Sequence, residues 1–190
     1  MAVSYSNKTH FEVLPNGLTI HLKEIHTAPI ISAWVWYRVG SRNEVPGLTG
    51  ISHWVEHMQF KGTQAFPAGN LDREISRVGG QWNAMTYLDW TTYYETLPAY
   101  TFNISLNLEA DRMINSQFLP DEVARERTVI ISEREGNENQ PLFQLGEAIQ
   151  KAAFSQHPYK HEVIGEKEDL QTISRDDLYQ HYRQYYQPTN

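Results

Sequence analysis

The sequence contains no cysteine, and this absence excludes several kinds of site at once. Disulfide bonds, thiolate nucleophiles and cysteine-bound zinc all require the missing side chain. Any metal ion held by this chain must therefore be bound by histidine and carboxylate groups. The sequence has 8 His and 23 Asp and Glu residues to supply them.

Long hydrophobic runs are missing as well. A helix that spans a membrane needs about 18 or more consecutive apolar residues, and no such run occurs, so we expect no membrane span. Residues 1–10 are polar and lack the apolar centre of a signal peptide, which favours a cytoplasmic location. Only 16 Lys and Arg residues, scattered along the chain, give a net charge of -7, which argues against a nucleic-acid partner.

What is present fits one globular domain. The chain has 190 residues, of which 40% are hydrophobic and 21% charged, and such a composition builds an ordinary core. Period-two alternation and turn residues predict strands, and apolar periodicity predicts helices. The expected strands are 9–14, 18–24, 30–39, 81–87 and 90–97, and the expected helices are 50–60, 71–78, 98–116, 120–137, 142–154 and one from 174 onward. This order indicates an α+β fold rather than alternating βα units.

Helix starts are marked by residues that can accept hydrogen bonds from free backbone N–H groups. Thr49, Asn70 and Ser174 are the expected N-caps of three helices. Asp177 follows Ser174 by three residues, as in a capping box.

The first expected helix contains a pattern typical of a metal site, His53-Trp54-Val55-Glu56-His57. Residues four apart on a helix lie one above the other on the same face, so both imidazoles can reach one ion. Glu56 lies on nearly the same face and can touch a bound water without being a ligand itself. This is the H-x-x-E-H order.

A third ligand must come from elsewhere in the chain. The expected helix at 120–137 offers Glu126 and Glu133, which are seven residues apart and therefore share one helix face. One of them can bind the metal while the other supports it from behind. A Glu-rich helix is also typical of a solvated surface, and two histidines can be structural. The conjunction favours the metal site, because the rest of the helix around His53 is apolar.

With these residues, the sequence resembles the pitrilysin/insulinase family of zinc metallopeptidases, also called inverzincins. Within this family it is most similar to the processing peptidases and their short bacterial relatives. The resemblance covers almost the whole chain. It runs through these blocks: Pro15-Asn16-Gly17-Leu18; 36–44; Gly50 to Thr63, with Lys61-Gly62-Thr63 at its end; Gly79-Gly80 to Thr86, with Asp89, Thr91, Tyr93 and Tyr94; Glu126-Arg127 and 131–135; His157-Pro158-Tyr159; and Val163-Ile164-Gly165.

The resemblance implies roles for individual residues. His53, His57 and Glu133 would bind one Zn²⁺ ion. Glu56 would be the general base, and Glu126 an acidic residue that supports catalysis. Two further residues, Asn83 and Ala84, lie on a strand edge that would pair with the substrate backbone.

The implied fold is that of the N-terminal domain of mitochondrial processing peptidase, with a mostly antiparallel sheet and helices on one face. The implied activity is zinc-dependent hydrolysis of peptide bonds in unstructured peptides, with a zinc-activated water and a Glu general base. In the family an Arg/Tyr pair from a second, similarly folded half stabilises the oxyanion. Residues 186–190 resemble the point where the family enters its next strand. Residues 1–190 are thus expected to be an N-terminal catalytic domain cut short, with little activity alone.

The missing half would lie in the same chain or in a partner subunit, as a homodimer or a heterodimer. A non-catalytic scaffold subunit with the same fold is the alternative function, although such subunits typically lose ligands. Zinc chemistry on a non-peptide substrate also stays open, since a fold does not fix a function.

Overall fold

The computed structural model describes residues 9–190. The polar N-terminal stretch in which we expected no signal peptide therefore lies, up to residue 8, outside the described residues. Within the described range, no helix is both long and apolar enough to cross a membrane.

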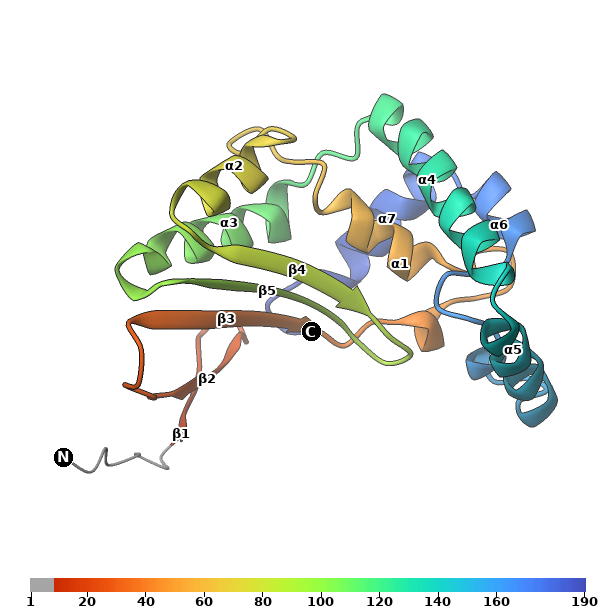
Figure 1. Cartoon of the computed structure of the whole chain (residues 1–190), viewed down its shortest axis with the longest axis horizontal. Coiled ribbons are helices and arrows are strands. Elements are labelled where there is room, and N and C mark those ends of the chain that lie inside the picture. Colours follow the sequence, from red (N-terminus) through yellow and green to blue (C-terminus); the bar gives the residue numbers. More distant parts are fainter. Residues whose placement is uncertain (1–8) are drawn as a thin grey trace.

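A three-stranded antiparallel sheet forms the centre of the molecule (Figure 1). Its strands are β3 (Ile30–Tyr37), β5 (Thr91–Pro98) and β4 (Gln81–Thr86), with β5 in the middle. Side chains of β3 and β4 alternate between exposed and less exposed positions, as expected for strands with one face covered. Strand β5 is the most buried of the three because it has a neighbour on each side.

The face of this sheet away from the helices carries aromatic side chains. Trp34 of β3 and Tyr94 of β5 are register partners, and their rings stack with centroids 4.2 Å apart. Trp36 stacks on Trp34 and meets Trp90 edge to face. Trp34 and Trp36 remain 46% and 52% exposed, so this face forms an apolar surface open to solvent in the described part of the chain.

A separate hairpin precedes the sheet. Strands β1 (Thr9–Val13) and β2 (Thr19–Lys23) pair antiparallel and lie on the opposite side of β3 from the helices in Figure 1. Gly17 takes a positive φ of 88° in the connecting turn, which glycine adopts without strain. The hairpin expected around Pro15-Asn16-Gly17 is confirmed.

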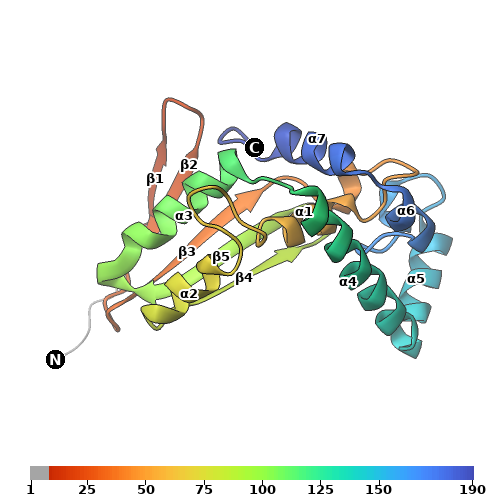
Figure 2. The ribbon, with the colours of Figure 1, turned by 90° about the horizontal axis from the view of Figure 1, so that it is seen from above.

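Helices cover one face of the three-stranded sheet, and this confirms the expected α+β arrangement (Figure 1). Helices α1, α2 and α3 contact its strands, while α7 and α4 pack against α1. Figure 2 shows α4, α5 and α6 grouped at one end of the molecule. The helices are α1 (Ile51–Met58), α2 (Asn70–Arg77), α3 (Phe102–Asn115), α4 (Pro120–Glu138), α5 (Pro141–Ala153), α6 (Lys167–Thr172) and α7 (Arg175–Tyr185). Short 3₁₀ turns lie at Ser41–Asn43, Ala99–Thr101 and Pro158–Lys160.

Helix α1 runs through the middle of the main core. Trp54 and Val55 are fully buried there, against Ile130 of α4 and Tyr182 of α7. Burying one large apolar side chain contributes about 1.5–3 kcal/mol. A helix with apolar residues on most of its surface is fixed from several sides, and this fixes the direction of its few polar side chains.

Two of the expected N-caps are wrong. The residue before α1 is Gly50, with φ 85°, and the residue before α2 is Gly69, with φ 78°. Thr49 instead donates its hydroxyl hydrogen to Asp169, 2.7 Å away. Asn70 is the first residue of α2 rather than its cap. The third expectation is confirmed, because Ser174 caps α7 in a capping box with Asp177.

Two backbone N–H groups at the start of α1 donate to the side chain of Glu44, which lies in the loop before the helix. Glu44 is buried, and it accepts hydrogen bonds from the backbone of Gly50 (2.8 Å) and Ser52 (2.9 Å). Burial raises the pKa of Glu44 to about 8, and the hydrogen bonds from the Ser52 and Gly50 backbone act against that rise. Glu44 therefore takes the part that we expected of Thr49.

The start of α1 also crosses the loop that precedes α6 at very short range. A Cβ atom on Gly50 would lie 2.4 Å from the Ile164 carbonyl oxygen, and one on Gly165 would lie 2.3 Å from the Thr49 carbonyl oxygen. Both glycines have φ of 85°. Two main chains can approach this closely only where neither residue has a side chain.

Replacing Gly50 should cost far more folding stability than replacing a glycine that has only an unusual φ. Gly47→Ala is the matched control, because Gly47 has φ of 91° but open space around it. Left-handed backbone at a non-glycine residue costs about 1–3 kcal/mol, and Gly50→Ala adds a backbone collision. We expect urea unfolding to give a clearly larger loss of stability for Gly50→Ala. Equal losses for both variants would contradict the close crossing.

The α1–α7 contact should make stability depend on pH. His181 of α7 is buried, with Nε2 3.2 Å from Ser52 Oγ of α1, and burial lowers its pKa to about 4. Below its ordinary pKa of about 6.5 the unfolded chain takes up a proton that the folded chain refuses. Stability should therefore fall as the pH falls from 6.5 to 4, by about 3 kcal/mol from this residue.

His181→Gln should flatten this pH dependence, and His21→Gln, on the exposed hairpin, serves as the control. The measurement is urea unfolding of the three proteins between pH 7 and pH 4. If His181→Gln loses stability with falling pH as steeply as His21→Gln does, the buried imidazole does not contribute as described.

Candidate metal centre

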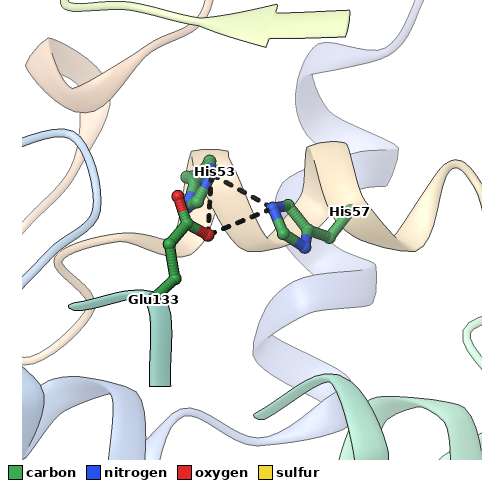
Figure 3. Close-up of side chains that lie close together, drawn as sticks. All are labelled: His53, His57 and Glu133. Atoms are coloured by element: carbon green, nitrogen blue, oxygen red, sulfur yellow. Dashed lines mark hydrogen bonds and ion pairs between the residues drawn. The ribbon is translucent and has the colours of Figure 1, made fainter. Parts of the chain in front are cut away.

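Two helices distant in sequence bring three metal-ligating side chains together (Figure 3). His53 and His57 lie one turn apart on α1, and their Nε2 atoms are 3.1 Å from each other. Glu133 of α4 points its Oε2 between them, 3.9 Å from Nε2 of His53 and 3.7 Å from Nε2 of His57. In the described residues, these three form the group able to hold a metal ion.

This geometry fits a zinc ion. Tetrahedral zinc with bonds of about 2.0–2.2 Å to nitrogen and oxygen needs ligand atoms about 3.3–3.4 Å apart. The three observed separations bracket that value, so small side-chain rotations suffice. Two imidazoles and one carboxylate form a ligand set that suits zinc and leaves a fourth position open.

His53 is held in its neutral form. Burial lowers its pKa to about 3, and the charge of His57 acts in the same direction. A neutral imidazole has one nitrogen lone pair free for a metal. Its other ring nitrogen, Nδ1, is buried and has no hydrogen-bond partner in residues 9–190.

His57 is oriented by a carboxylate behind it. Its Nδ1 donates to Glu126 Oε1 at 2.8 Å, and Lys61 Nζ lies 2.5 Å from Glu126 Oε2. Burial acts to lower the pKa of His57, but the hydrogen bond and charge of Glu126 outweigh it and the pKa is raised. Burial acts to raise the pKa of Glu126, and the bonds from His57 and Lys61 outweigh it, so this pKa is lowered. Glu126 is thus an ionised acceptor, and because it holds the hydrogen on Nδ1, Nε2 is the nitrogen of His57 that can bind a metal once it has lost its own proton.

The seven-residue spacing of Glu126 and Glu133 did not decide which of them faces the imidazoles, and the structure shows how each one lies. Glu133 lies beside the imidazole Nε2 atoms, and its side chain is 42% exposed. Glu126 lies behind His57 and is only 6% exposed. The structure therefore brings Glu133 together with the two imidazoles and places Glu126 behind His57, while their roles as ligand and supporting acid stay predictions.

Glu56 is buried beside the two histidines and is held by β4. Thr86, the last residue of that strand, donates its hydroxyl hydrogen to Glu56 Oε2 at 2.5 Å. Burial raises the pKa of Glu56, while hydrogen bonds from Thr86 act against that rise. A carboxyl group with a raised pKa in a closed environment is suited to exchange a proton near neutral pH.

A second threonine supports the first. Thr91 of β5 is the register partner of Thr86, and their hydroxyl oxygens are 3.3 Å apart. Thr91 gives its own hydrogen to the carbonyl of Val39. The single hydroxyl hydrogen of Thr86 thus has two possible acceptors, Thr91 Oγ1 at 3.3 Å and Glu56 Oε2 at 2.5 Å, and the shorter contact is the one to Glu56.

Asn83 and Ala84 lie on strand β4, which pairs with β5 alone among the described strands. Asn83 is exposed and its side chain accepts the Ala84 backbone N–H at 2.8 Å. The strand end at Thr86 touches Glu56. The edge on which we expected substrate to pair therefore leads directly to the expected base.

A small cavity of about 210 Å³ opens at the ligand group. His53, Glu133 and Thr86 line one part of it, and apolar side chains line another. The other lining residues are Asn137, Phe143, Glu162, Val163 and Ile164.

Three residues that hold this site had no role predicted from the sequence. Thr86, Lys61 and Glu44 contact, respectively, Glu56, Glu126 and the start of α1. The position of Lys61 four residues after His57 gave a usable signal, because it predicts a common helix face. The Thr86 contact joins β4 to α1, 30 residues apart, and the Glu44 contact depends on the fold of the loop before α1.

Comparison with known proteins gives the class of the chain. Residues 19–167 match the model of the insulinase family, peptidase family M16. The chain belongs to this family, as the sequence resemblance predicted.

Particular relatives are zinc proteases. The chain is 35% identical over 191 residues to the zinc protease PqqE of Helicobacter pylori, covering 100% of this chain and 43% of that protein. It is 34% identical over 173 residues to the uncharacterized zinc protease YmxG of Bacillus subtilis (91% of this chain, 42% of that protein). It is also 34% identical over 171 residues to the beta subunit of mitochondrial-processing peptidase of Blastocladiella emersonii (90% and 37%).

Solved structures agree with this assignment. A protease from Helicobacter pylori superposes with a TM-score of 0.94 at 35% identity, covering 96% of this chain and 44% of that one. The first half of the periplasmic protease PqqL from Escherichia coli gives a TM-score of 0.88 at 25% identity, covering 100% and 42%. The chain thus spans less than half the length of these relatives.

Removing one expected ligand should abolish tight zinc binding. Removing Glu135, a nearby acid on the same helix, should not. We expect the protein to bind one zinc ion, and Glu133→Gln or His53→Ala to weaken binding at least about 100-fold, because zinc sites of this kind need three protein ligands. Glu135→Gln is the matched control, since Glu135 lies on the same helix but pairs with Lys167. Competition with a chromogenic chelator measures all four affinities. Equal affinity for Glu133→Gln and Glu135→Gln would exclude Glu133 as a ligand.

Proposed function

We propose that this chain is the N-terminal catalytic domain of a zinc-dependent metallo-endopeptidase that hydrolyses unstructured peptides. His53, His57 and Glu133 are its zinc ligands, and Glu56 is its general base. One observation carries this proposal: the three potential ligands converge within reach of one ion, and a buried carboxyl group lies beside them.

The division of labour follows from the contacts. A bound zinc ion supplies a Lewis acid that polarises a carbonyl group and makes water more acidic. Glu56 takes a proton from the attacking water and later gives it to the leaving amine. Thr86 occupies part of one carboxylate oxygen of Glu56, and the remaining lone pairs stay available for that proton.

The substrate is an extended peptide. Strand β4 has an edge free of a partner in residues 9–190, and an extended backbone can add to such an edge through main-chain hydrogen bonds. Asn83 and Ala84 would then pair with the peptide close to Glu56. An unstructured peptide can add its backbone to this edge without first giving up hydrogen bonds of its own fold, so unstructured peptides are the proposed substrate class.

The active enzyme requires a second half. Relatives are more than twice as long as the matched region, and one solved structure is described as the first half of a protease. We propose that the second, homologous half supplies an Arg/Tyr pair for the oxyanion. It would come from the same protein or from a partner subunit in a homodimer or heterodimer.

A scaffold role is the other function considered for this fold. An M16 inactive domain from Pseudomonas fluorescens superposes with a TM-score of 0.83 at 17% identity, which is a likeness of fold alone. The present chain retains a full ligand group and a buried carboxyl group beside it. This favours an enzyme over a scaffold.

Cleavage should need zinc, Glu56 and the second half together. We expect little cleavage of an unstructured fluorogenic peptide by residues 1–190 alone. Addition of the second half of the Helicobacter pylori relative as a separate chain should raise the rate, and zinc chelation should remove the gain. Glu56→Gln should retain zinc but lower kcat at least about 1,000-fold, since the general base is lost.

Glu74→Gln, at a half-buried position on α2 where Glu74 pairs with Arg77, is the control for the loss of a carboxylate. The two halves of the Helicobacter pylori relative, mixed under the same conditions, serve as the positive control. If that pair cleaves the peptide and the zinc-loaded mixed pair does not, the proposed activity is wrong. If Glu56→Gln cleaves as fast as the native chain, Glu56 is not the base.

A further inference from the structure

Lys61 lies one helical turn beyond His57, just after the end of α1 at Met58. Its ammonium group is 2.5 Å from Glu126 Oε2, while Oε1 of the same carboxylate accepts from His57 Nδ1 at 2.8 Å. The carboxylate of Glu126 therefore connects a lysine on one side with a candidate metal ligand on the other.

Glu126 depends on these two donors. Its side chain is only 6% exposed, and a carboxylate removed from water must be compensated by hydrogen bonds and an opposite charge. His57 supplies one neutral hydrogen bond when its Nε2 binds a metal. Lys61 is then the positive charge in contact with Glu126.

The other two ligands lack support of this kind. The Nδ1 atom of His53 is buried without a hydrogen-bond partner among the described residues. Glu133 is 42% exposed at the end of a flexible side chain. Figure 3 shows Nε2 of His53 and Oε2 of Glu133 facing Nε2 of His57. The ordering of the ligand group thus rests mainly on the hydrogen bond behind His57.

Contacts of the neighbouring backbone fix the position of Lys61. The next residue, Gly62, has φ of 91°, and a Cβ atom there would lie 2.5 Å from the backbone nitrogen of Ala68. The backbone N–H of Lys61 donates to the Met58 carbonyl at 3.0 Å, and the Thr63 hydroxyl donates to Asp111. These contacts fix the chain on both sides of Lys61 and so direct its side chain toward α4.

We propose that Lys61 is a positioning residue of the zinc centre. It holds the carboxylate of Glu126 against Nδ1 of His57, and the carboxylate in turn keeps Nε2 of His57 aimed at the ion. Lys61 contacts neither zinc nor substrate. The inference rests on the zinc site of the proposed function, but it does not depend on peptide cleavage.

The alternative is an ordinary ion pair that only joins two helices. The chain offers a matched control for it, because Lys167 pairs with Glu135, another glutamate of α4, on the exposed side of that helix. An ordinary ion pair would change the stability of the metal-free protein and leave zinc affinity unchanged. A positioning residue would change zinc affinity.

The test is the zinc dissociation constant of the native chain, Lys61→Met, Lys61→Arg and Lys167→Met, measured by competition with a chromogenic chelator. Residues that orient a ligand from behind typically affect metal affinity 10–100-fold. We expect Lys61→Met to weaken zinc binding about 10-fold. Lys61→Arg, which keeps the charge, should stay within about 3-fold of the native value, and Lys167→Met should match it. Urea unfolding of the metal-free proteins shows whether each variant folds.

A double-mutant cycle then tests the route through Glu126. In a Glu126→Gln background, Lys61→Met should cause little further loss of zinc affinity, because the group through which it acts is gone. Equal zinc affinity of Lys61→Met and the native chain would overturn the inference, and so would the same loss in both backgrounds. A native chain that binds no zinc would instead overturn the zinc centre itself.

Discussion

The contact between α1 and α4 is the constraint on which the site depends. Helix α1 supplies both imidazoles, and α4 supplies both the acid that faces them and the acid behind them. Apolar packing of Trp54, Val55 and Ile130 fixes the two helices against each other. A slip of one residue along either helix would turn its ligands by about 100° and separate the group. The positions of the polar side chains at the site therefore depend on the hydrophobic packing between the two helices.

Around this contact, several groups of the site are held by other parts of the chain. Strand β4 holds Glu56 through Thr86, and Glu44 holds the start of α1. The loop before α6 meets Gly50 without intervening side chains. Such supports make the arrangement present before any ligand arrives, and preorganised groups need less rearrangement during a reaction.

Much of this could be predicted from sequence where the signal was local. Helical periodicity placed His53 and His57 on one face, and the spacing of Glu126 and Glu133 predicted one metal-facing acid and one supporting acid. Periodicity alone left open which acid took which role, because that depends on how far each lies along α4 relative to α1. The expected caps Thr49 and Asn70 failed because a glycine with positive φ precedes each helix. The role of Thr86 depends on long-range packing, which no local pattern encodes, and the contact of Glu44 with Gly50 depends on how the loop between them folds.

The aromatic face of the sheet has a consequence for spectroscopy. Trp34 and Trp36 are exposed and stacked on each other, whereas Trp54 is fully buried on α1 next to His53, with the Arg127 guanidinium 4.8 Å above its ring. The exposed pair should emit further to the red than Trp54, with half-buried Trp82 and Trp90 between these extremes. Quenching of the red component by a soluble agent would report coverage of the sheet face, while the blue component would report the surroundings of the helix that carries the two imidazoles.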